Sequence, residues 1–223
     1  MEYTVRRAPE RPSLKGLWDE PAWSAAEVGR LTHFNSRGSG HRPEVQFKVA
    51  WRDDGLFVFF RVDDRYVRCT RSDFQASVCK DSCCEFFVQP HPDKGYFNFE
   101  INCGGTLLLY YIRDRPGIEG APAVREPVSA AAAGTMEIYH SMPRIVYPEI
   151  EEPIEWRIEY FIPFSLFEKY VGALGPAEGR AWRANFYKCA DESSHPHWAS
   201  WAPIDDILNF HLPGYFQTIR FAK

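Results

Sequence analysis

Short runs in which apolar and polar residues alternate are the feature that most limits how this chain can fold. The run YFNFEIN, residues 96–102, has three apolar side chains at alternate positions, with Asn98, Glu100 and Asn102 between and after them. Successive side chains of a strand point to opposite faces of its sheet, whereas a helix needs apolar residues three and four positions apart. The run therefore predicts a strand with one apolar face and one polar face.

Six further runs are short and rich in β-branched and aromatic residues: EVQFKVAW (44–51), LFVFFRV (56–62), CCEFFVQ (83–89), TLLLYYI (106–112), IEWRIEYFI (154–162) and RANFYKCA (183–190). Turn-forming residues, such as those of HPDKG (91–95), separate them. Seven or more strands spaced in this way predict an all-β protein with an antiparallel β-sandwich.

Helices are expected to be few. The run PFSLFEKYVG (163–172) has Pro near its start and Gly at its end, which predicts a short helix. The run SAAAAG (129–134) has good helix propensity but is too short to hold a helix alone in water. The proline-containing segment 113–155 lacks a clear period, so we expect an irregular excursion over the sandwich. No linker divides the chain, so residues 1–223 are expected to form a single domain.

The charge balance disfavours several classes of partner. The formal net charge is −4 and the isoelectric point is near 6.0, with no cluster of Lys and Arg. Binding to nucleic acid or to an anionic membrane surface needs such a cluster, so neither partner is expected. The N-terminal residues lack the apolar core of a signal peptide, which favours a cytoplasmic location. An extracellular location stays open if a leader has been removed.

The six cysteines, at positions 69, 79, 83, 84, 103 and 189, could indicate disulfides or a metal site. Two of them are adjacent, and no second pair lies at the spacing of a zinc finger. Most lie within strand-like runs, where a free Cys behaves as a small hydrophobic residue. We therefore expect reduced, buried thiols. The pair His195 and His197 gives only a weak metal signal, because no third ligand follows at a fixed spacing.

A hairpin through PHPDKG (90–95) would pair the runs 83–89 and 96–102 and bring Glu85 onto the face of the polar row. That face is either an ordinary solvated sheet face or the floor of a binding site. Asn is disfavoured in strands, which favours a functional reason for the row. Carboxylates and carboxamides offer the paired acceptors and donors that vicinal hydroxyls require, so Glu85, Asn98, Glu100 and Asn102 are candidate ligand-binding residues.

A second group of candidates lies in the loop-like stretch 190–216, where aromatic rings sit among Pro, Ser and Asp. Trp198 and Phe210 are candidates for an exposed wall that stacks on a sugar ring. Trp201 is expected to plug the end of the core instead.

Several stretches, taken in order, resemble the family 9 carbohydrate-binding modules, and more closely their stand-alone family 9-like relatives. These stretches are LKGLWDEPAWSAAEV, DGLFVFFRVDD, KDSCCEFFV, YFNFEIN and SWAPIDDILNFHLPGYFQTIRF. The resemblance runs from about Leu14 to Phe221. It implies an immunoglobulin-like β-sandwich related to DOMON domains, no catalysis, and in some members structural calcium.

The same resemblance implies where a sugar site would lie. Glu85 matches the family's binding glutamate, and the family's arginine and asparagine fall on Asn98 and Glu100. One of the two rings that clamp the sugar falls near Cys79, where Phe74 could substitute for it. The other ring falls near Phe210, and Gln217 replaces a glycine close to the last strand.

Three functions remain open from the sequence. The first is non-catalytic binding of a mono- or oligosaccharide, or of a polyol. The second is a protein-interaction or structural module that has lost its sugar site. The third is an enzyme that acts on glycosides with Glu85 and Glu100 as paired carboxylates. No cofactor is expected, although a structural calcium could be bound by loop aspartates: Asp53, Asp54, Asp63, Asp64, Asp73 and Asp81.

Overall fold

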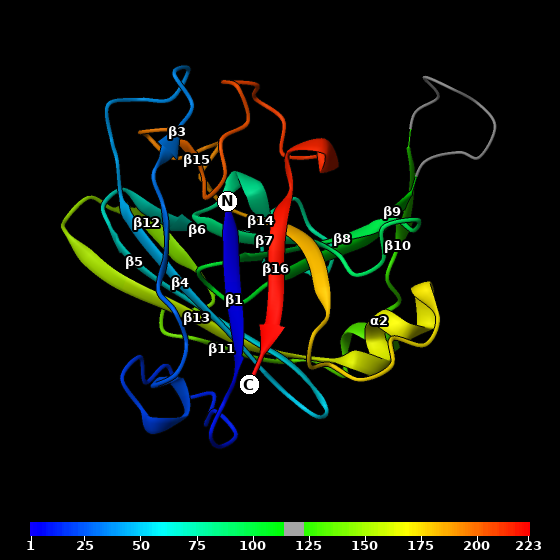
Figure 1. The fold of residues 1–223 in the computed structure, drawn as a ribbon. Coiled ribbons are helices and arrows are strands. Elements are labelled where there is room, and N and C mark those ends of the chain that lie inside the picture. Colours follow the sequence, from blue (N-terminus) through cyan, green and yellow to red (C-terminus); the bar gives the residue numbers. More distant parts are fainter. Residues whose placement is uncertain (114–122) are drawn as a thin grey trace.

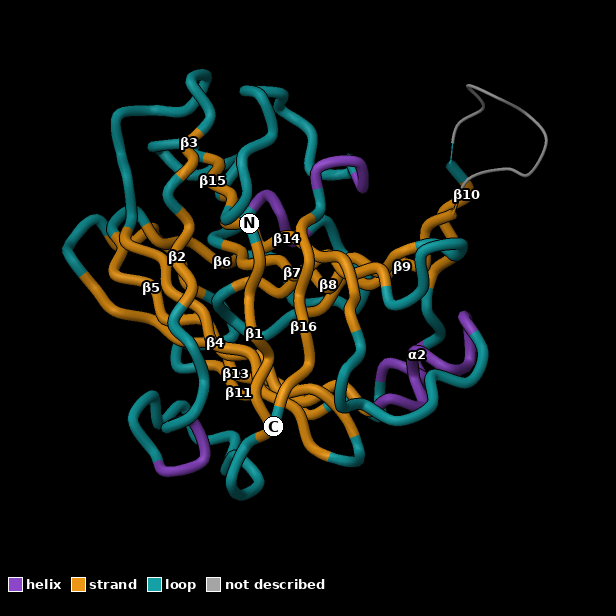
Figure 2. Tube along the Cα trace, in the orientation of Figure 1, coloured by secondary structure: helices purple, strands orange, loops and turns teal. Residues whose placement is uncertain are grey.

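The computed structural model describes residues 1–113 and 123–223, and most of its regular structure is in strands (Figures 1 and 2). All seven runs predicted to be strands are strands: β4 (Glu44–Arg52), β5 (Gly55–Asp64), β7 (Cys83–Gln89), β8 (Tyr96–Asn102), β9 (Leu107–Arg113), β13 (Ile154–Pro163) and β14 (Ala181–Cys189). The alternation of side chains therefore predicted the main strands correctly.

The remaining strands are mostly shorter: β1 (Glu2–Arg7), β2 (Gly29–Leu31), β3 (His33–Phe34), β6 (Val67–Cys69), β10 (Val124–Pro127), β11 (Glu137–His140), β12 (Val146–Ile150), β15 (Trp198–Ser200) and β16 (Gln217–Ala222). The described part of the segment 113–155, which was expected to wind over the sandwich, contains regular structure and contributes β10, β11 and β12. These strands lie at sheet edges, where a proline such as Pro127 or Pro148 removes no ladder hydrogen bond. Residues 114–122 of the expected excursion lie outside the described residues.

Two α-helices and three 3₁₀ turns accompany the strands in residues 1–113 and 123–223. The predicted helix is α2 (Phe164–Val171), which ends at Gly172 with φ of 84°, a conformation that favours glycine. The second, α1 (Ala130–Ala133), begins where the Ser129 side chain accepts a hydrogen bond from the Ala132 backbone N–H. The 3₁₀ turns are η1 (Pro21–Trp23), η2 (Val78–Lys80) and η3 (Pro213–Tyr215).

Eleven of the described strands form one ladder in the order β10-β9-β8-β7-β14-β16-β1-β4-β5-β13-β11. The strands β2, β3 and β15 join this sheet beside the ladder, and β6 and β12 pair in a separate two-stranded sheet. Pairing is antiparallel except at β1, which runs parallel to both β16 and β4. The ladder folds back on itself so that β4 lies across from β14, and the rings of Phe47 and Phe186 stack with centroids 3.7 Å apart. The two layers make an immunoglobulin-like β-sandwich, as predicted (Figure 1).

The inward faces of β7 and β8 supply part of the core, including Phe86 and Phe99. Trp201 is buried there against Tyr3 and Phe47, so the expectation that it plugs the core is confirmed. A second aromatic cluster lies on the other face of β5, where the segment containing η1 covers it. The face of β7 and β8 that points away from the core is therefore the one that carries the polar row.

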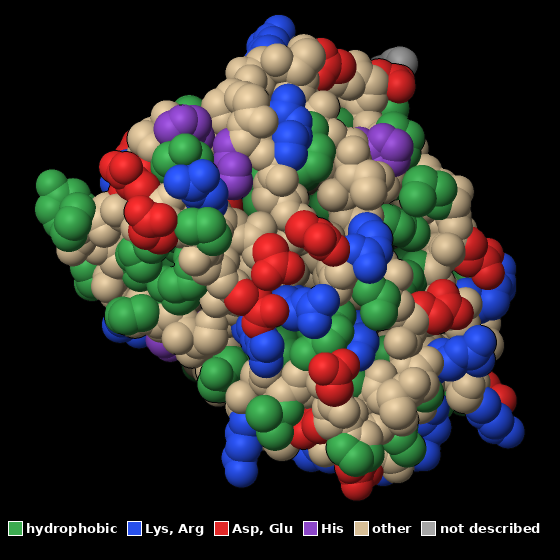
Figure 3. Space-filling view, turned by 90° about the vertical axis from the view of Figure 1, so that its left-hand side faces the viewer, with side chains coloured by type: hydrophobic (Ala, Val, Ile, Leu, Met, Phe, Trp, Pro, Cys, Tyr) green, Lys and Arg blue, Asp and Glu red, His purple; other side chains and the backbone are tan. Residues whose placement is uncertain are grey.

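On the face shown in Figure 3, acidic and basic side chains are interspersed and neither sign forms a broad area. In the part of the chain that the structure describes, neither helix has the length and apolar character needed to cross a bilayer.

Candidate functional site

The hairpin of β7 and β8 forms in the predicted register. Glu85 lies directly opposite Glu100, and Asn98 lies opposite Phe87. Opposed residues of an antiparallel pair share a face of the sheet. The structure thus brings Glu85, Asn98 and Glu100 together on the face that points away from the core.

The polar row is almost completely buried. Glu85 and Asn98 are each 2% exposed and Glu100 is 6% exposed, and the loop at 208–211 borders the same hollow. The interpretation of the row as an ordinary solvated sheet face is therefore wrong. The register could be predicted from local alternation, but the burial of the row could not.

Beside the row lies a cavity of about 720 Å³. It is bounded by the η2 turn, by the outer faces of β7, β8, β9 and β14, and by the loop at 208–211. Its lining residues are Ser77, Cys79, Glu85, Phe87, Asn98, Glu100, Leu108, Tyr110, Arg125, Cys189, Asp191, Trp198, Leu208, Asn209, Phe210 and His211. A cavity of this size, with mixed aromatic and polar walls, is typical of a small-molecule site.

Hydrogen bonds fix the orientation of the polar row. Asn98 donates from Nδ2 to Oε1 of Glu100 at 2.7 Å, and its Oδ1 accepts from the backbone N–H of Tyr110 at 2.7 Å. Cys189 donates from Sγ to Oε1 of Glu85 at 3.0 Å. The carboxamide and both carboxyl groups are thereby held in place beside the cavity.

The two carboxyl groups have unusual acidity. Burial raises the pKa of Glu85 well above its ordinary value, and the charge of Glu100 raises it further. Burial also raises the pKa of Glu100 to about 7, against the opposing effect of the Asn98 bond. In the described part of the chain, no Lys, Arg or His nitrogen lies within 4.0 Å of either carboxylate. Near neutral pH the pair therefore retains protons and can donate as well as accept hydrogen bonds.

Asn102 shares the face of the row but lies outside the cavity. Its Nδ2 donates to Oδ2 of Asp81 at 3.0 Å and to the backbone oxygen of Arg71 at 2.8 Å, and its Oδ1 accepts from the Thr106 N–H. These bonds hold the turn after β8 against the η2 region. Its expected place in the binding floor is therefore corrected to a structural role.

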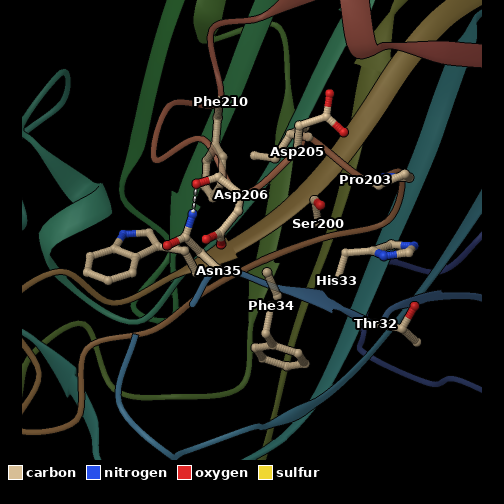
Figure 4. A pocket seen from close by; sticks show the side chains of 12 residues that line it. Thr32, His33, Phe34, Asn35, Ser200, Pro203, Asp205, Asp206 and Phe210 are labelled. Carbon is tan, nitrogen blue, oxygen red and sulfur yellow. Dashed lines mark hydrogen bonds between the residues drawn. The ribbon is translucent and has the colours of Figure 1, made fainter. Parts of the chain in front are cut away.

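Trp198 and Phe210 both border the cavity and are half-buried. Trp198 donates from Nε1 to Asp191 at 2.7 Å, and Phe210 stacks on Tyr187 with ring centroids 4.1 Å apart. Both rings also border a second hollow of about 360 Å³, shown in Figure 4, so they lie in the wall between the two. In that hollow Asn35 donates to the backbone oxygen of Asp206.

The family resemblance placed one of the two sugar-clamping rings near Cys79 or Phe74. Only one of these two positions borders the cavity. Cys79 does, but Phe74 lines a separate hollow with Gly105 and Met136. Phe74 therefore does not replace the ring there, because its side chain borders a different hollow. Gln217 is the first residue of β16, and its Nε2 donates to the backbone oxygen of Tyr215.

Most of the other lining residues were not predicted from the sequence, and Tyr110, Arg125, Asp191 and His211 are the ones among them that carry a polar group on a long or charged side chain. Tyr110 could have been found, because extending the strand register to β9 places it opposite Asn98. The others lie in loops or at a sheet edge, where no periodicity applies. His211 contacts the Tyr96 hydroxyl at 3.0 Å, and burial lowers its pKa to about 4, so it is neutral at physiological pH.

A separate buried network surrounds Lys188, which points to the core side of β14. Its Nζ donates to Nε2 of His197 at 2.7 Å and lies 3.6 Å from Asp64, which also accepts from His41. Burial lowers the pKa of His197 to about 3, and Nδ1 of its ring is bonded to the backbone oxygen of His195. Both ring nitrogens of His197 are thus hydrogen-bonded to groups of the protein itself.

The aspartates considered for calcium do not converge in the described part of the chain. No three of their carboxylates lie within 4.8 Å of one another. Asp53, Asp54 and Asp81 each pair with an arginine. Calcium binding stays a prediction that the structure does not test.

The sequence of this chain matches a known protein family. Residues 23–221 match the carbohydrate-binding family 9. The chain belongs to carbohydrate-binding family 9. This confirms the resemblance found in the sequence, and the match includes β7, β8 and the loop at 208–211.

Solved structures of family 9 and related proteins share the fold. A Bacteroides uniformis protein, provisionally described as carbohydrate-binding, is 28% identical with a TM-score of 0.84, covering 99% of this chain and 98% of its own. A family 9 module from Caldicellulosiruptor kristjanssonii in complex with cellotriose is 14% identical with a TM-score of 0.65, covering 100% and 94%. A module from the same organism in complex with glucose is 13% identical with a TM-score of 0.62, covering 99% and 96%. No curated protein matches the chain in sequence.

Proposed function

We propose that this protein binds a mono- or oligosaccharide in the 720 Å³ cavity and releases it unchanged. The observation that carries the proposal is the position of two half-buried rings, Trp198 and Phe210, on the same cavity as the buried row of Glu85, Asn98 and Glu100. Sugars present both a polar rim and an apolar ring face, and this cavity offers a surface for each.

The polar row suits hydroxyl groups. Near neutral pH the Glu85 and Glu100 pair offers both acceptors and a donor, since the pKa of each is raised. Asn98 is already held by Tyr110, so little side-chain freedom is lost when a ligand binds. We expect dissociation constants on the order of 10 μM to 1 mM, because the hydrogen bonds replace strong hydration of the sugar.

Membership of family 9 supports a saccharide as the ligand, and two structural neighbours hold cellotriose and glucose. Those neighbours are too distant in sequence to carry residue roles across. The choice between sugars therefore rests on measurement with this chain.

The test is a panel of mono- and oligosaccharides, followed by isothermal titration calorimetry and by the shift in melting temperature. Asn98→Ala is expected to weaken the best ligand about tenfold or more, since it removes the donor that orients Glu100. Asn102→Ala is the matched control: the same residue type, strand and face, but outside the cavity. It is expected to lower stability and leave affinity unchanged.

Two outcomes would overturn the proposal. If saturating sugars change neither tryptophan fluorescence nor the melting temperature, the chain is better described as an interaction or structural module.

The second outcome is hydrolysis of a glycoside, which the opposed carboxyl groups of Glu85 and Glu100 also allow because they retain protons. Hydrolysis products that disappear in both Glu85→Gln and Glu100→Gln would establish that activity instead.

A further inference from the structure

Two thiols lie close to the carboxyl group of Glu85, one of the residues of the polar row. Cys83 and Cys189 lie directly opposite each other on β7 and β14, and Glu85 is two residues along β7 on the same face. The Sγ atoms of the two cysteines and a carboxylate oxygen of Glu85 all lie within 4.8 Å of one another. All three side chains are buried, each 2% exposed or less.

The register of the two strands explains why these groups converge. Opposed residues of an antiparallel pair place their side chains side by side, and residues two apart on one strand share a face. Cys84 shows the contrast: it is the next residue after Cys83, but it points into the sandwich core with Phe86. The meeting of Cys83, Glu85 and Cys189 is thus a property of one face of the sheet.

The chemistry of the three groups matches that of a thiophilic divalent cation. Zinc binds Cys sulfur at about 2.3 Å and carboxylate oxygen at about 2.0–2.2 Å, which sets the sulfurs of a tetrahedral site about 3.8 Å apart. The spacing here is within the range that small side-chain rotations can bring to these values. Thiolates favour zinc over calcium or magnesium, which prefer oxygen ligands.

The remaining coordination position would face the cavity. Glu85 and Cys189 both line it, together with Cys79 and Asp191 on the adjoining segments. The backbone N–H of Asp191 donates to the oxygen of Cys79 at 3.1 Å, so this end of the cavity is tied together by the backbone. Sites with three protein ligands and one open position are the form in which zinc meets a small molecule.

We propose that Cys83, Glu85 and Cys189 form a zinc site at the back of the cavity, with its open position directed to the cavity. The inference goes beyond the proposed function and does not depend on it, since the metal would bind without any sugar present. Binding releases the thiol protons, so affinity is expected to increase with pH.

The experiment uses the whole chain, purified under reducing conditions and stripped of metal with a chelator. Zinc chloride is titrated against a chromophoric competing chelator, without sugar, and cobalt is added separately to look for thiolate-to-metal charge-transfer absorption. We expect one equivalent of zinc, a zinc-dependent rise in melting temperature and a cobalt thiolate band.

Matched variants decide which residues bind. Cys83→Ser and Cys189→Ser are expected to weaken zinc binding at least tenfold, whereas Cys84→Ser, which is equally buried, keeps it. Circular dichroism and thermal unfolding of each variant without zinc separate loss of binding from loss of folding. If Cys83→Ser or Cys189→Ser does not fold, Glu85→Gln is expected to show the same loss of zinc affinity.

Three results would overturn the inference. The first is that the reduced protein binds no stoichiometric zinc. The second is that Cys84→Ser loses as much zinc affinity as Cys83→Ser and Cys189→Ser. The third is a Cys83–Cys189 disulfide whose reduction gives no zinc binding. Asn98→Ala is expected to bind zinc normally, because Asn98 is not among the three ligands. A protein that binds sugar but not zinc would therefore reject this inference alone, and one that binds zinc but no sugar would reject only the proposed function.

Discussion

Glu85 and Glu100 lie directly opposite each other on β7 and β8 and face the same cavity, both almost fully buried. Two like charges cannot share such a place without cost, so the pair keeps protons at pH values where exposed glutamates have lost them. This relationship links the stability of the fold to the chemistry of the cavity.

The first prediction concerns Glu100→Gln. The pKa of Glu100 is raised to about 7 in the folded state, above its value in the unfolded chain. Between pH 5 and 7 the folded state therefore holds a proton that the unfolded chain has lost. The free energy of unfolding falls as pH rises through that window. Glutamine removes this cost. We expect the variant to be more stable than the wild type at pH 8, by up to about 3 kcal/mol, and similar at pH 5.

Urea unfolding at pH 5, 6, 7 and 8 measures the difference. Glu178→Gln, on the surface, serves as control and is expected to show no pH-dependent difference. A difference for Glu100→Gln that stays constant from pH 5 to 8 would contradict the raised pKa.

The second prediction concerns which of two hollows holds the ligand, since Trp198 and Phe210 border both. Phe34 lines the smaller hollow but not the cavity. Phe210→Ala is expected to lower sugar affinity by about 1–2 kcal/mol through loss of an aromatic contact. Phe34→Ala is expected to leave it unchanged, as measured by calorimetry. Loss of affinity in Phe34→Ala would place the sugar in the smaller hollow.

The third prediction concerns the buried ion pair of Asp64 and Lys188. Burial alone would raise the pKa of Asp64, but Lys188 and the bond from His41 outweigh it and lower the pKa below its ordinary value. Asp64→Asn leaves the buried ammonium group unpaired and is expected to cost about 3–5 kcal/mol at pH 7.

The stabilisation from Asp64 is present above its unfolded pKa of about 4 and is lost as pH falls below it. Asp73→Asn, on the surface, is the control and is expected to change stability by no more than about 0.5 kcal/mol. Equal unfolding free energies for wild type and Asp64→Asn at pH 7 would show that the pair is not stabilising.

The fourth prediction concerns the contact between the layers. Phe186 is fully buried and its ring contacts Phe47, Phe86 and Trp201. Phe186→Ala is expected to lower the free energy of unfolding by about 3–5 kcal/mol, because it leaves a cavity between the sheets. Phe74→Ala, 41% exposed, is expected to cost far less by the same denaturant measurement. Similar costs for the two variants would contradict the packing described.

The main strands, the hairpin of β7 and β8 and the face of the polar row could all be predicted from the sequence. Each follows from local rules: side chains alternate along a strand, and a turn such as HPDKG sets how two neighbouring runs pair. Glu85 could therefore be placed beside Asn98 and Glu100 from residues that lie within 20 positions of one another.

The burial of that face follows from contacts between segments that are distant in the sequence. The loop at 208–211, which borders the cavity, lies more than a hundred positions further along the chain, so no local period could reveal that the row is buried. Three further contacts could not be predicted for the same reason. Asn102 donates a hydrogen bond to Asp81, Phe74 lines a separate hollow, and Cys189 lies opposite Cys83. Such contacts depend on how distant segments pack, because burial and pairing are properties of the assembled layers.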